Sequence, residues 1–198
     1  YTYIIPDIPG FGSSALPEGQ FALSDIAEEL LTWMNDIGIT SFALIGHSLG
    51  GYISLEMARQ APKNCLGISL FHSTAHADNP EKKRNRTKVA EFIRRHGKDA
   101  FLQAFIPGLY YQSGPWIHEV EYMVNSTDAK SIISFTLAMR DRPDHQDLIK
   151  QFNGRIQFIA GDKDTFISAE SLKAQVDLSP NAKLNLLENI GHLGMMED

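Results

Sequence analysis

Short apolar runs alternate with helical patterns along the first third of the chain. Residues 3–5, 39–45 and 66–71 have the composition of buried strands. Between them, apolar residues recur every three or four positions in residues 26–37 and 49–60, the spacing of a helix that buries one face. Strands that alternate with helices of this length predict β-α-β units. We therefore expect an α/β fold, with a mostly parallel sheet covered by helices on both faces.

Capping residues mark the ends of several expected elements. Ser24 is expected to cap the first helix, and Gly38 is placed to end it. The alternation returns near the C-terminus, where residues 155–160 and 183–187 resemble buried strands. Ser168 can cap a helix between these two strands. The last part of the chain therefore predicts a continuation of the same sheet.

Residues 73–152 carry helical patterns and no strand signal. We interpret this segment as a helical cap, or lid, inserted into an α/β core made of residues 1–72 and 153–198. The segment is rich in aromatic residues, some of which we expect to line an apolar substrate pocket over the strand ends. Ordinary packing between the cap and the core explains most of them equally well. Its basic run at residues 82–95 is interrupted by Glu91 and preceded by Glu81, and we interpret it as a solvated helix face.

Composition narrows the classes of partner. The chain has 198 residues and a formal net charge of −6, which argues against nucleic acid or an anionic membrane as the main partner. Cys65 is the only cysteine, so an internal disulfide is impossible and a reducing, cytoplasmic setting is favoured. No run approaches the roughly 20 apolar residues of a membrane span. The pattern leaves the oligomeric state open.

Both ends of the chain lie close to features of the expected fold. Tyr1 directly precedes a strand-like run, and Asp198 follows His192 by six residues. We expect the natural protein to continue beyond both ends.

The strand at residues 39–45 runs into Gly46-His47-Ser48-Leu49-Gly50-Gly51, and a helical pattern follows at once. This is the G-x-S-x-G pattern of a nucleophile elbow, a sharp turn between a strand and a helix. The glycines two positions before and two positions after Ser48 lack the Cβ atoms that would clash in such a turn. Ser48 is therefore predicted to lie exposed at the apex.

A serine nucleophile needs a base, and the base needs an acid to orient it. Asp164 follows one predicted strand and His192 follows the next, so each would lie at a strand end near Ser48. Asp162 competes with Asp164 for the role of the acid. His47 adjoins the serine, and we expect its side chain to point elsewhere and to be structural.

Two other kinds of site are weakly supported. The loop at residues 6–14 holds Gly10 and Gly12, but Ala15 stands where a dinucleotide-binding fingerprint needs a third glycine. His72 and His76 have a spacing seen in zinc sites, but they lie in an expected loop with no glutamate between them. We therefore expect no cofactor and no metal.

Four motifs together resemble the α/β-hydrolase fold superfamily, in its small, capped esterase-like branch. They are residues 7–14, residues 46–51, residues 161–164 and Gly191-His192. The order of serine, acid and histidine is also that of the superfamily. The resemblance implies that Ser48 is the nucleophile, Asp164 the acid and His192 the general base.

The resemblance also implies an oxyanion hole, to which the backbone N–H of Leu49 would contribute. Its second donor would lie before Tyr1. The expected activity is that of a serine hydrolase, a carboxylesterase that cleaves an ester or thioester of a small, apolar acyl substrate. Carbon–carbon bond hydrolases, cofactor-free haloperoxidases and peptidases of the same superfamily remain alternatives, as does a ligand-binding receptor on this fold. Dehalogenases and epoxide hydrolases are disfavoured because they use aspartate where Ser48 stands.

Overall fold

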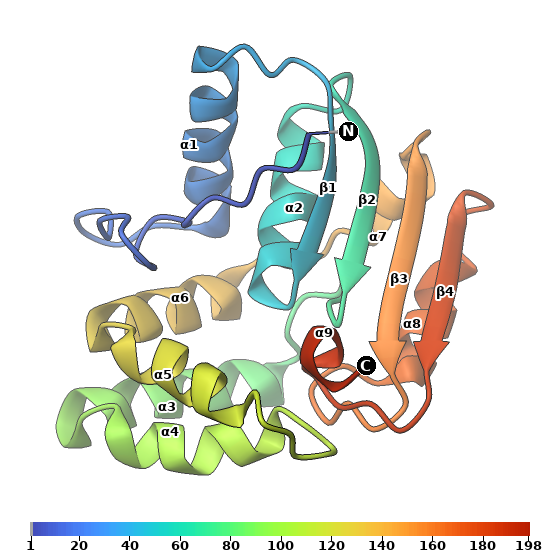
Figure 1. Ribbon diagram of the computed structural model, residues 1–198. Helices are drawn as coiled ribbons and strands as arrows, with labels where there is room; N and C mark the ends of the chain where they lie inside the picture. Colours follow the sequence, from blue (N-terminus) through green and yellow to red (C-terminus); the bar gives the residue numbers. More distant parts are fainter. Residues whose placement is uncertain (1) are drawn as a thin grey trace.

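The computed structural model describes residues 2–198, among which four strands form one parallel sheet (Figure 1). The strands are β1 (Phe42–His47), β2 (Cys65–Phe71), β3 (Arg155–Gly161) and β4 (Ala182–Leu187), and they lie side by side in that order. The helices are α1 (Leu23–Asp36), α2 (Leu49–Gln60), α3 (Pro80–His96), α4 (Asp99–Phe105), α5 (Ile117–Ser126), α6 (Ala129–Asp141), α7 (Gln146–Gln151), α8 (Ala169–Val176) and α9 (Gly194–Glu197). The expected α/β class and parallel sheet are confirmed.

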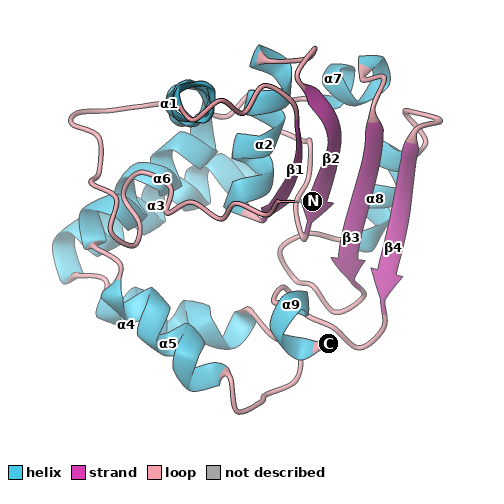
Figure 2. Cartoon of the chain, turned by 45° about the horizontal axis from the view of Figure 1, so that its top comes forward, coloured by secondary structure: helices cyan, strands magenta, loops and turns pink. Residues whose placement is uncertain are grey.

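Helices α2, α7 and α8 cover one face of the sheet (Figures 1 and 2). Leu55, Ile149 and Leu172, one from each of these helices, belong to a single core cluster with the sheet residues of that face. On the opposite face, Ile45 is 72% exposed and Gln157 is also exposed. Within residues 2–198 the helical cover is thus on one face, whereas the sequence pattern predicted cover on both.

The strand expected at residues 3–5 does not form. Tyr3 and Ile5 are 81% and 94% exposed. Within the described chain β1 pairs with β2 alone, so residues 3–5 make no ladder with its other edge. An apolar run becomes a strand only where a neighbour satisfies its backbone hydrogen bonds.

The first helix begins slightly earlier than Ser24 predicted. Helix α1 starts at Leu23, and its N-cap is Ala22. Asp25 replaces the expected cap, because its Oδ2 accepts a hydrogen bond of 2.8 Å from the backbone N–H of Ala22. The other end agrees with the prediction, since Gly38 has φ +79° just beyond the helix.

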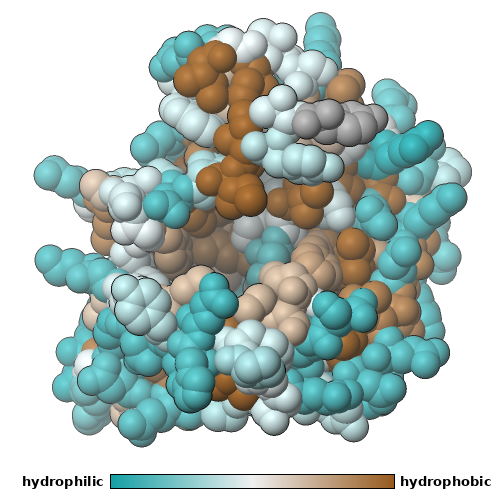
Figure 3. All heavy atoms as spheres, in the orientation of Figure 1, coloured by the Kyte–Doolittle hydropathy of each residue, from teal (hydrophilic) through white to brown (hydrophobic). Residues whose placement is uncertain are grey.

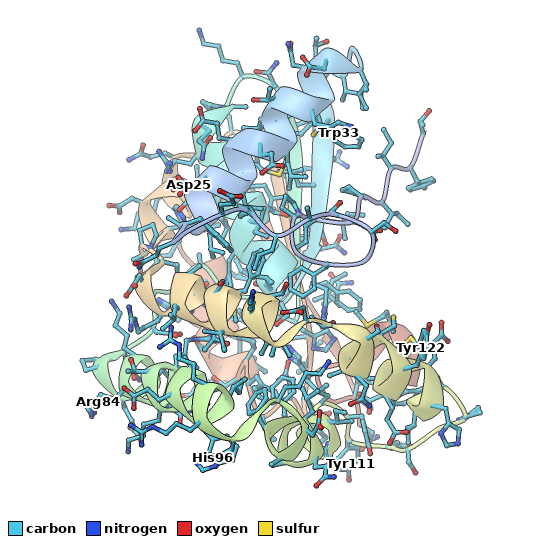
Figure 4. All side chains as sticks on the ribbon, turned by 90° about the vertical axis from the view of Figure 1, so that its left-hand side faces the viewer. Asp25, Trp33, Arg84, His96, Tyr111 and Tyr122 are labelled. Atoms are coloured by element: carbon cyan, nitrogen blue, oxygen red, sulfur yellow. The ribbon has the colours of Figure 1, made fainter. Side chains whose placement is uncertain are left out.

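Helices α3 to α6 lie beyond the carboxyl ends of the strands (Figures 1 and 2). Helix α6 reaches back to the N-terminal part of the chain, where the ring of Phe135 contacts those of Phe11 and Phe21. The exposed face of α3 is basic, and Figure 4 shows Arg84 and His96 pointing away from the other helices. This arrangement suits the predicted cap.

Helix α7 was not expected from the sequence. Its Ile149 is fully buried in the core cluster of the sheet. The chain has therefore returned to the core before residue 153, the predicted start of the second core segment. The limits of the cap, 73 and 152, stay a prediction.

Candidate active site

Ser48 lies in a sharp turn between β1 and α2. Its backbone has φ 49° and ψ −112°, a region that residues with a Cβ seldom adopt. A Cβ on Gly46 would clash with the backbone of Gly50, and one on Gly51 would clash with Ser73. A Cβ on Gly50 would meet no atom outside its own helix within 4 Å. The position after Ser48 that requires a glycine is therefore Gly51, and not Gly50 as the sequence pattern predicts.

The structure brings Ser48, His192 and Asp164 together from the ends of three strands. His192 Nε2 is 2.9 Å from Ser48 Oγ, and His192 Nδ1 is 2.8 Å from Asp164 Oδ2. Asp164 and His192 are buried, whereas Ser48 is partly exposed. Two consecutive hydrogen bonds thus connect the hydroxyl group to the carboxylate.

Only one of the two candidate acids contacts His192. Asp162 instead accepts a hydrogen bond of 2.6 Å from the backbone N–H of Asn189 and pairs with Lys163. Asp164 Oδ1 accepts hydrogen bonds from the backbone N–H groups of Phe166 and Ile167, at 2.8 and 3.1 Å. These bonds turn its other oxygen, Oδ2, toward the histidine.

Asp164 is held in its ionised form. Burial alone would raise the pKa of this carboxyl group, because it disfavours the charge. Hydrogen bonds from His192, His72 and the backbone of Ile167 outweigh burial, so the pKa lies well below its usual range. An ionised carboxylate only accepts hydrogen bonds, so His192 Nδ1 must carry a proton. Its Nε2 is then free to accept the proton of Ser48.

The loop that carries His192 is held from two sides. The backbone N–H of His192 donates to the carbonyl oxygen of Leu109, at 2.9 Å. His47 Nε2 lies 2.8 Å from the carbonyl oxygen of His192, so it donates to that oxygen. Burial, and to a lesser extent the neighbouring His192, lower the pKa of His47 from 6.5 to about 4. His47 is therefore neutral near pH 7, and its contact with the His192 backbone fits the structural part we expected of it.

His72, which follows β2 directly, also contacts the acid. Its Nδ1 lies 3.0 Å from Asp164 Oδ2, and the residue is completely buried. The sequence pattern offers this histidine only as half of a poor zinc motif. Its position at the carboxyl end of a strand was a usable signal, because parallel strands end at the same edge of a sheet.

His72, Asp164 and His192 form the one group of metal-ligand type in residues 2–198, with ligand atoms within 4.8 Å of one another. In both histidines the Nδ1 atom contacts Asp164 Oδ2. Hydrogen bonds from the two imidazole groups to the carboxylate account for this geometry, so Asp164 Oδ2 faces two N–H groups.

Apolar and aromatic side chains surround the carboxyl ends of the strands. Figure 3 shows a hollow on this face of the molecule, with hydrophobic residues in its depth. The ring of Phe166 lies 5.0 Å from that of His192 and 5.6 Å from that of Phe105. Tyr111 and Tyr122 are more than half exposed and lie at the outer side of the molecule (Figure 4). One aromatic residue of the expected cap, Phe105, thus contacts Phe166 beside His192, whereas Tyr111 and Tyr122 face outward.

Leu49 is the first residue of α2, directly after Ser48. A backbone N–H at this position has no carbonyl partner one turn earlier in its helix, and it lies at the positive end of the helix dipole. It can therefore donate to a negatively charged oxygen beside Ser48.

None of the helices in residues 2–198 combines the length and the hydropathy needed to cross a bilayer.

Comparison with known proteins supports the fold described above. Residues 1–96 match the family described as alpha/beta hydrolase fold. A thermophilic esterase from Thermogutta terrifontis superposes with a TM-score of 0.90 at 29% identity, covering 97% of this chain and 73% of the esterase.

Sequence relatives include "Putative carbamate hydrolase RutD" of Pseudomonas savastanoi, 26% identical over 98% of this chain and 78% of that protein. "Lipase 3" of a Moraxella species is 24% identical over 100% of this chain. The chain spans 65% of that lipase, so it covers less than two thirds of it. These relatives support hydrolase activity, and the chain has the α/β-hydrolase fold.

Proposed function

We propose that the protein is a serine hydrolase that cleaves a carboxylic ester or thioester through an acyl-enzyme. The observation that carries the proposal is the pair of hydrogen bonds from Ser48 to His192 and from His192 to Asp164, at 2.9 and 2.8 Å. A serine hydroxyl group with a neutral imidazole at hydrogen-bonding distance is the arrangement that nucleophilic acyl transfer requires.

In this mechanism Ser48 Oγ attacks the acyl carbon while His192 Nε2 takes its proton. The imidazolium that forms is stabilised by the ionised Asp164 through Nδ1. His192 then gives the proton to the leaving alcohol or thiol, and the C–O or C–S bond breaks. Water, deprotonated by His192, releases the acid and restores Ser48.

The backbone N–H of Leu49 is proposed to stabilise the negative oxygen of the tetrahedral intermediate. Its place at the start of α2 supports this role, because donor and helix dipole act in the same direction. The loss of one donor of this type typically costs about a hundredfold to a thousandfold in rate. Phe166 beside His192 and the apolar hollow support an apolar acyl substrate.

The test is the substitution Ser48→Ala in the natural protein. We expect turnover of a short-chain p-nitrophenyl ester, and labelling by a fluorophosphonate probe, to be abolished. Ser54→Ala is the matched control, because Ser54 lies in α2 and its hydroxyl group donates to the Gly50 carbonyl oxygen, away from His192. Unchanged turnover in Ser48→Ala would contradict the proposal.

The substrate class is tested separately. A panel of short-chain esters, acyl thioesters and aminoacyl amides would distinguish an esterase from a thioesterase or a peptidase by the ratio of kcat/KM values. A folded protein that resists the fluorophosphonate and cleaves none of these compounds would instead favour a receptor on the same fold.

A further inference from the structure

The carboxylate of Asp164 has four hydrogen-bond donors around it, of which His192 is only one. Oδ1 faces the backbone N–H groups of Phe166 and Ile167. Oδ2 faces His192 Nδ1 at 2.8 Å and His72 Nδ1 at 3.0 Å. The proposed reaction uses His192 and does not use His72.

The environment of His72 fixes its protonation. Its side chain is 0% exposed, and its Nε2 atom has no hydrogen-bond partner among the described residues. Gly194 lies directly against that atom: a Cβ added to Gly194 would be only 2.4 Å from His72 Nε2. A proton on Nε2 would leave a buried N–H without an acceptor, which costs about 1–3 kcal/mol. The neutral form with its proton on Nδ1 avoids this cost and donates to Asp164.

The backbone of His72 is arranged for this contact. Its φ of 46° is uncommon for a residue with a side chain. The N–H of His72 donates to the carbonyl oxygen of Ile159 in β3, at 2.8 Å, and the hydroxyl group of Ser73 donates to the carbonyl oxygen of Ser48, at 2.8 Å. The end of β2 lies between the strands that precede Ser48 and Asp164. Two adjacent residues therefore connect the segment of the nucleophile with that of the acid.

We propose that His72 is a positioning residue for the reaction, which holds Asp164 Oδ2 in the orientation that His192 requires. This inference rests on the proposed function, because it assigns His72 a part in that reaction. A carboxylate can rotate about its Cβ–Cγ bond, and the N–H of His72 opposes that rotation from the side that His192 leaves open. Without it, Asp164 would orient His192 less well and the proton transfer from Ser48 would slow.

Two substitutions separate the donor from the bulk of the ring. In His72→Asn the amide nitrogen is bonded to Cγ, as Nδ1 is in histidine, so it can donate to Asp164. Asparagine also tolerates a positive φ. His72→Ala removes the donor and leaves Asp164 Oδ2 with His192 alone.

We expect His72→Ala to lower kcat by about tenfold to a hundredfold, with KM changed by no more than about twofold, because a small misplacement of a catalytic group has this effect. His72→Asn should retain kcat to within about threefold of the wild type. Thermal unfolding checks that both variants are folded at the assay temperature. Full kcat in His72→Ala, or an equal loss in the two variants, would overturn the inference.

A second measurement needs neither activity nor a stable His72→Ala variant. Proton NMR of the ¹⁵N-histidine-labelled protein should show several slowly exchanging imidazole N–H groups, because His47 and His145 are also hydrogen-bonded. One of these signals should be lost in His72→Asn and a different one in His192→Asn. Absence of the His72 signal would overturn the inference whether or not Ser48 is the nucleophile. Unchanged turnover in Ser48→Ala together with both signals would contradict the proposed function alone.

Discussion

Ser48 adopts a conformation that the residues around it must stabilise. Backbone in such a region costs about 1–3 kcal/mol. The N–H of Ser48 donates to the carbonyl oxygen of Phe71 at 3.0 Å, and the carbonyl oxygen of Ser48 accepts from Ser73 Oγ at 2.8 Å. Both partners come from the end of β2. The turn is therefore maintained by the neighbouring strand as well as by its own glycines.

The two glycines after Leu49 are expected to differ in their tolerance of a side chain. Gly51→Ala should destabilise the protein by about 1–3 kcal/mol, because the new Cβ would clash with Ser73. Gly50→Ala is the matched control, since nothing outside its own helix lies within 4 Å of the added atom. It should be neutral or stabilising by up to about 1 kcal/mol, because alanine favours a helix. Urea unfolding of both variants checks this, and an equal effect at the two positions would contradict it.

His47 is expected to make stability depend on pH. Its pKa is lowered from 6.5 to about 4 in the folded protein, chiefly by burial. The unfolded chain therefore binds a proton first as the pH falls, and the contribution of His47 to stability, complete above about pH 6.5, is lost between there and about pH 4.

Between pH 7 and pH 5 this loss amounts to about 2 kcal/mol. The variant His47→Gln can keep a donor for the His192 carbonyl group but does not titrate. Its free energy of unfolding should fall less over this interval, by about that amount. Urea unfolding at the two pH values provides the measurement. Parallel pH dependences in the two proteins would show that His47 is not the group responsible.

The sequence predicted which residues would meet at the site but not all of their partners. Ser48, Asp164 and His192 each follow a strand pattern, and parallel strands end at one edge, so the prediction brought the three side chains together. His72 follows a strand in the same way and was missed because no motif includes it. The contact depends on a positive φ that the pattern of apolar residues does not indicate.

At the scale of elements, periodicity predicted most helices and strands, and local chemistry shifted their ends. Ser168 caps α8 as expected, with its Oγ accepting from Ser171 N–H at 3.2 Å. Ser24 failed as a cap because Asp25, one position later, reaches the backbone of Ala22. Helix α7 was missed because six residues are too few to show a period.

The short helix α9 carries a side chain that joins the loop of His192 to the segment between α4 and α5. Glu197 accepts hydrogen bonds from the backbone N–H groups of Gly191 at 2.9 Å, Tyr111 at 2.8 Å and Gln112 at 3.0 Å. Two segments that are far apart in the sequence thus share one carboxylate. The position of His192 depends on that connection.

Glu197→Ala should therefore lower kcat by about tenfold, because the loop of His192 loses one of its anchors. Unfolding should become easier by about 1–3 kcal/mol, the usual effect of leaving backbone donors unpaired. The control is Asp198→Ala, which removes the same charge from an adjacent, exposed position. Steady-state kinetics and thermal unfolding of the two variants are the measurements. Equal behaviour would mean that charge, and not the hydrogen bonds, is responsible.

At the scale of the whole molecule, the helices of the expected cap are anchored to the core through buried charges. Asp78, just before α3, pairs with Arg86 of α3 and with Arg142, which follows α6 and lies 2.9 Å from it. Arg142 also stacks over the ring of Tyr52 in α2, 4.0 Å from its centre. The start and the end of the helical segment α3–α6 therefore meet at one carboxylate beside the core.

Asp78→Asn should destabilise the protein by about 3–5 kcal/mol, because two arginines would lose the charge that compensates them in a buried site. The control is Asp147→Asn, whose pair with Lys150 lies at the surface and contributes less than about 1 kcal/mol.

Burial would raise the pKa of Asp78, but the hydrogen bonds from Arg86 and Arg142 lower it overall. The contribution of the Asp78 charge to the free energy of unfolding is present above pH 3.9, which is about the pKa of an aspartate in the unfolded chain. It is lost as the pH falls further. Wild type and Asp78→Asn should thus differ in urea unfolding at pH 7 and converge in acid, and a difference that persists in acid would contradict an origin in the charge of Asp78.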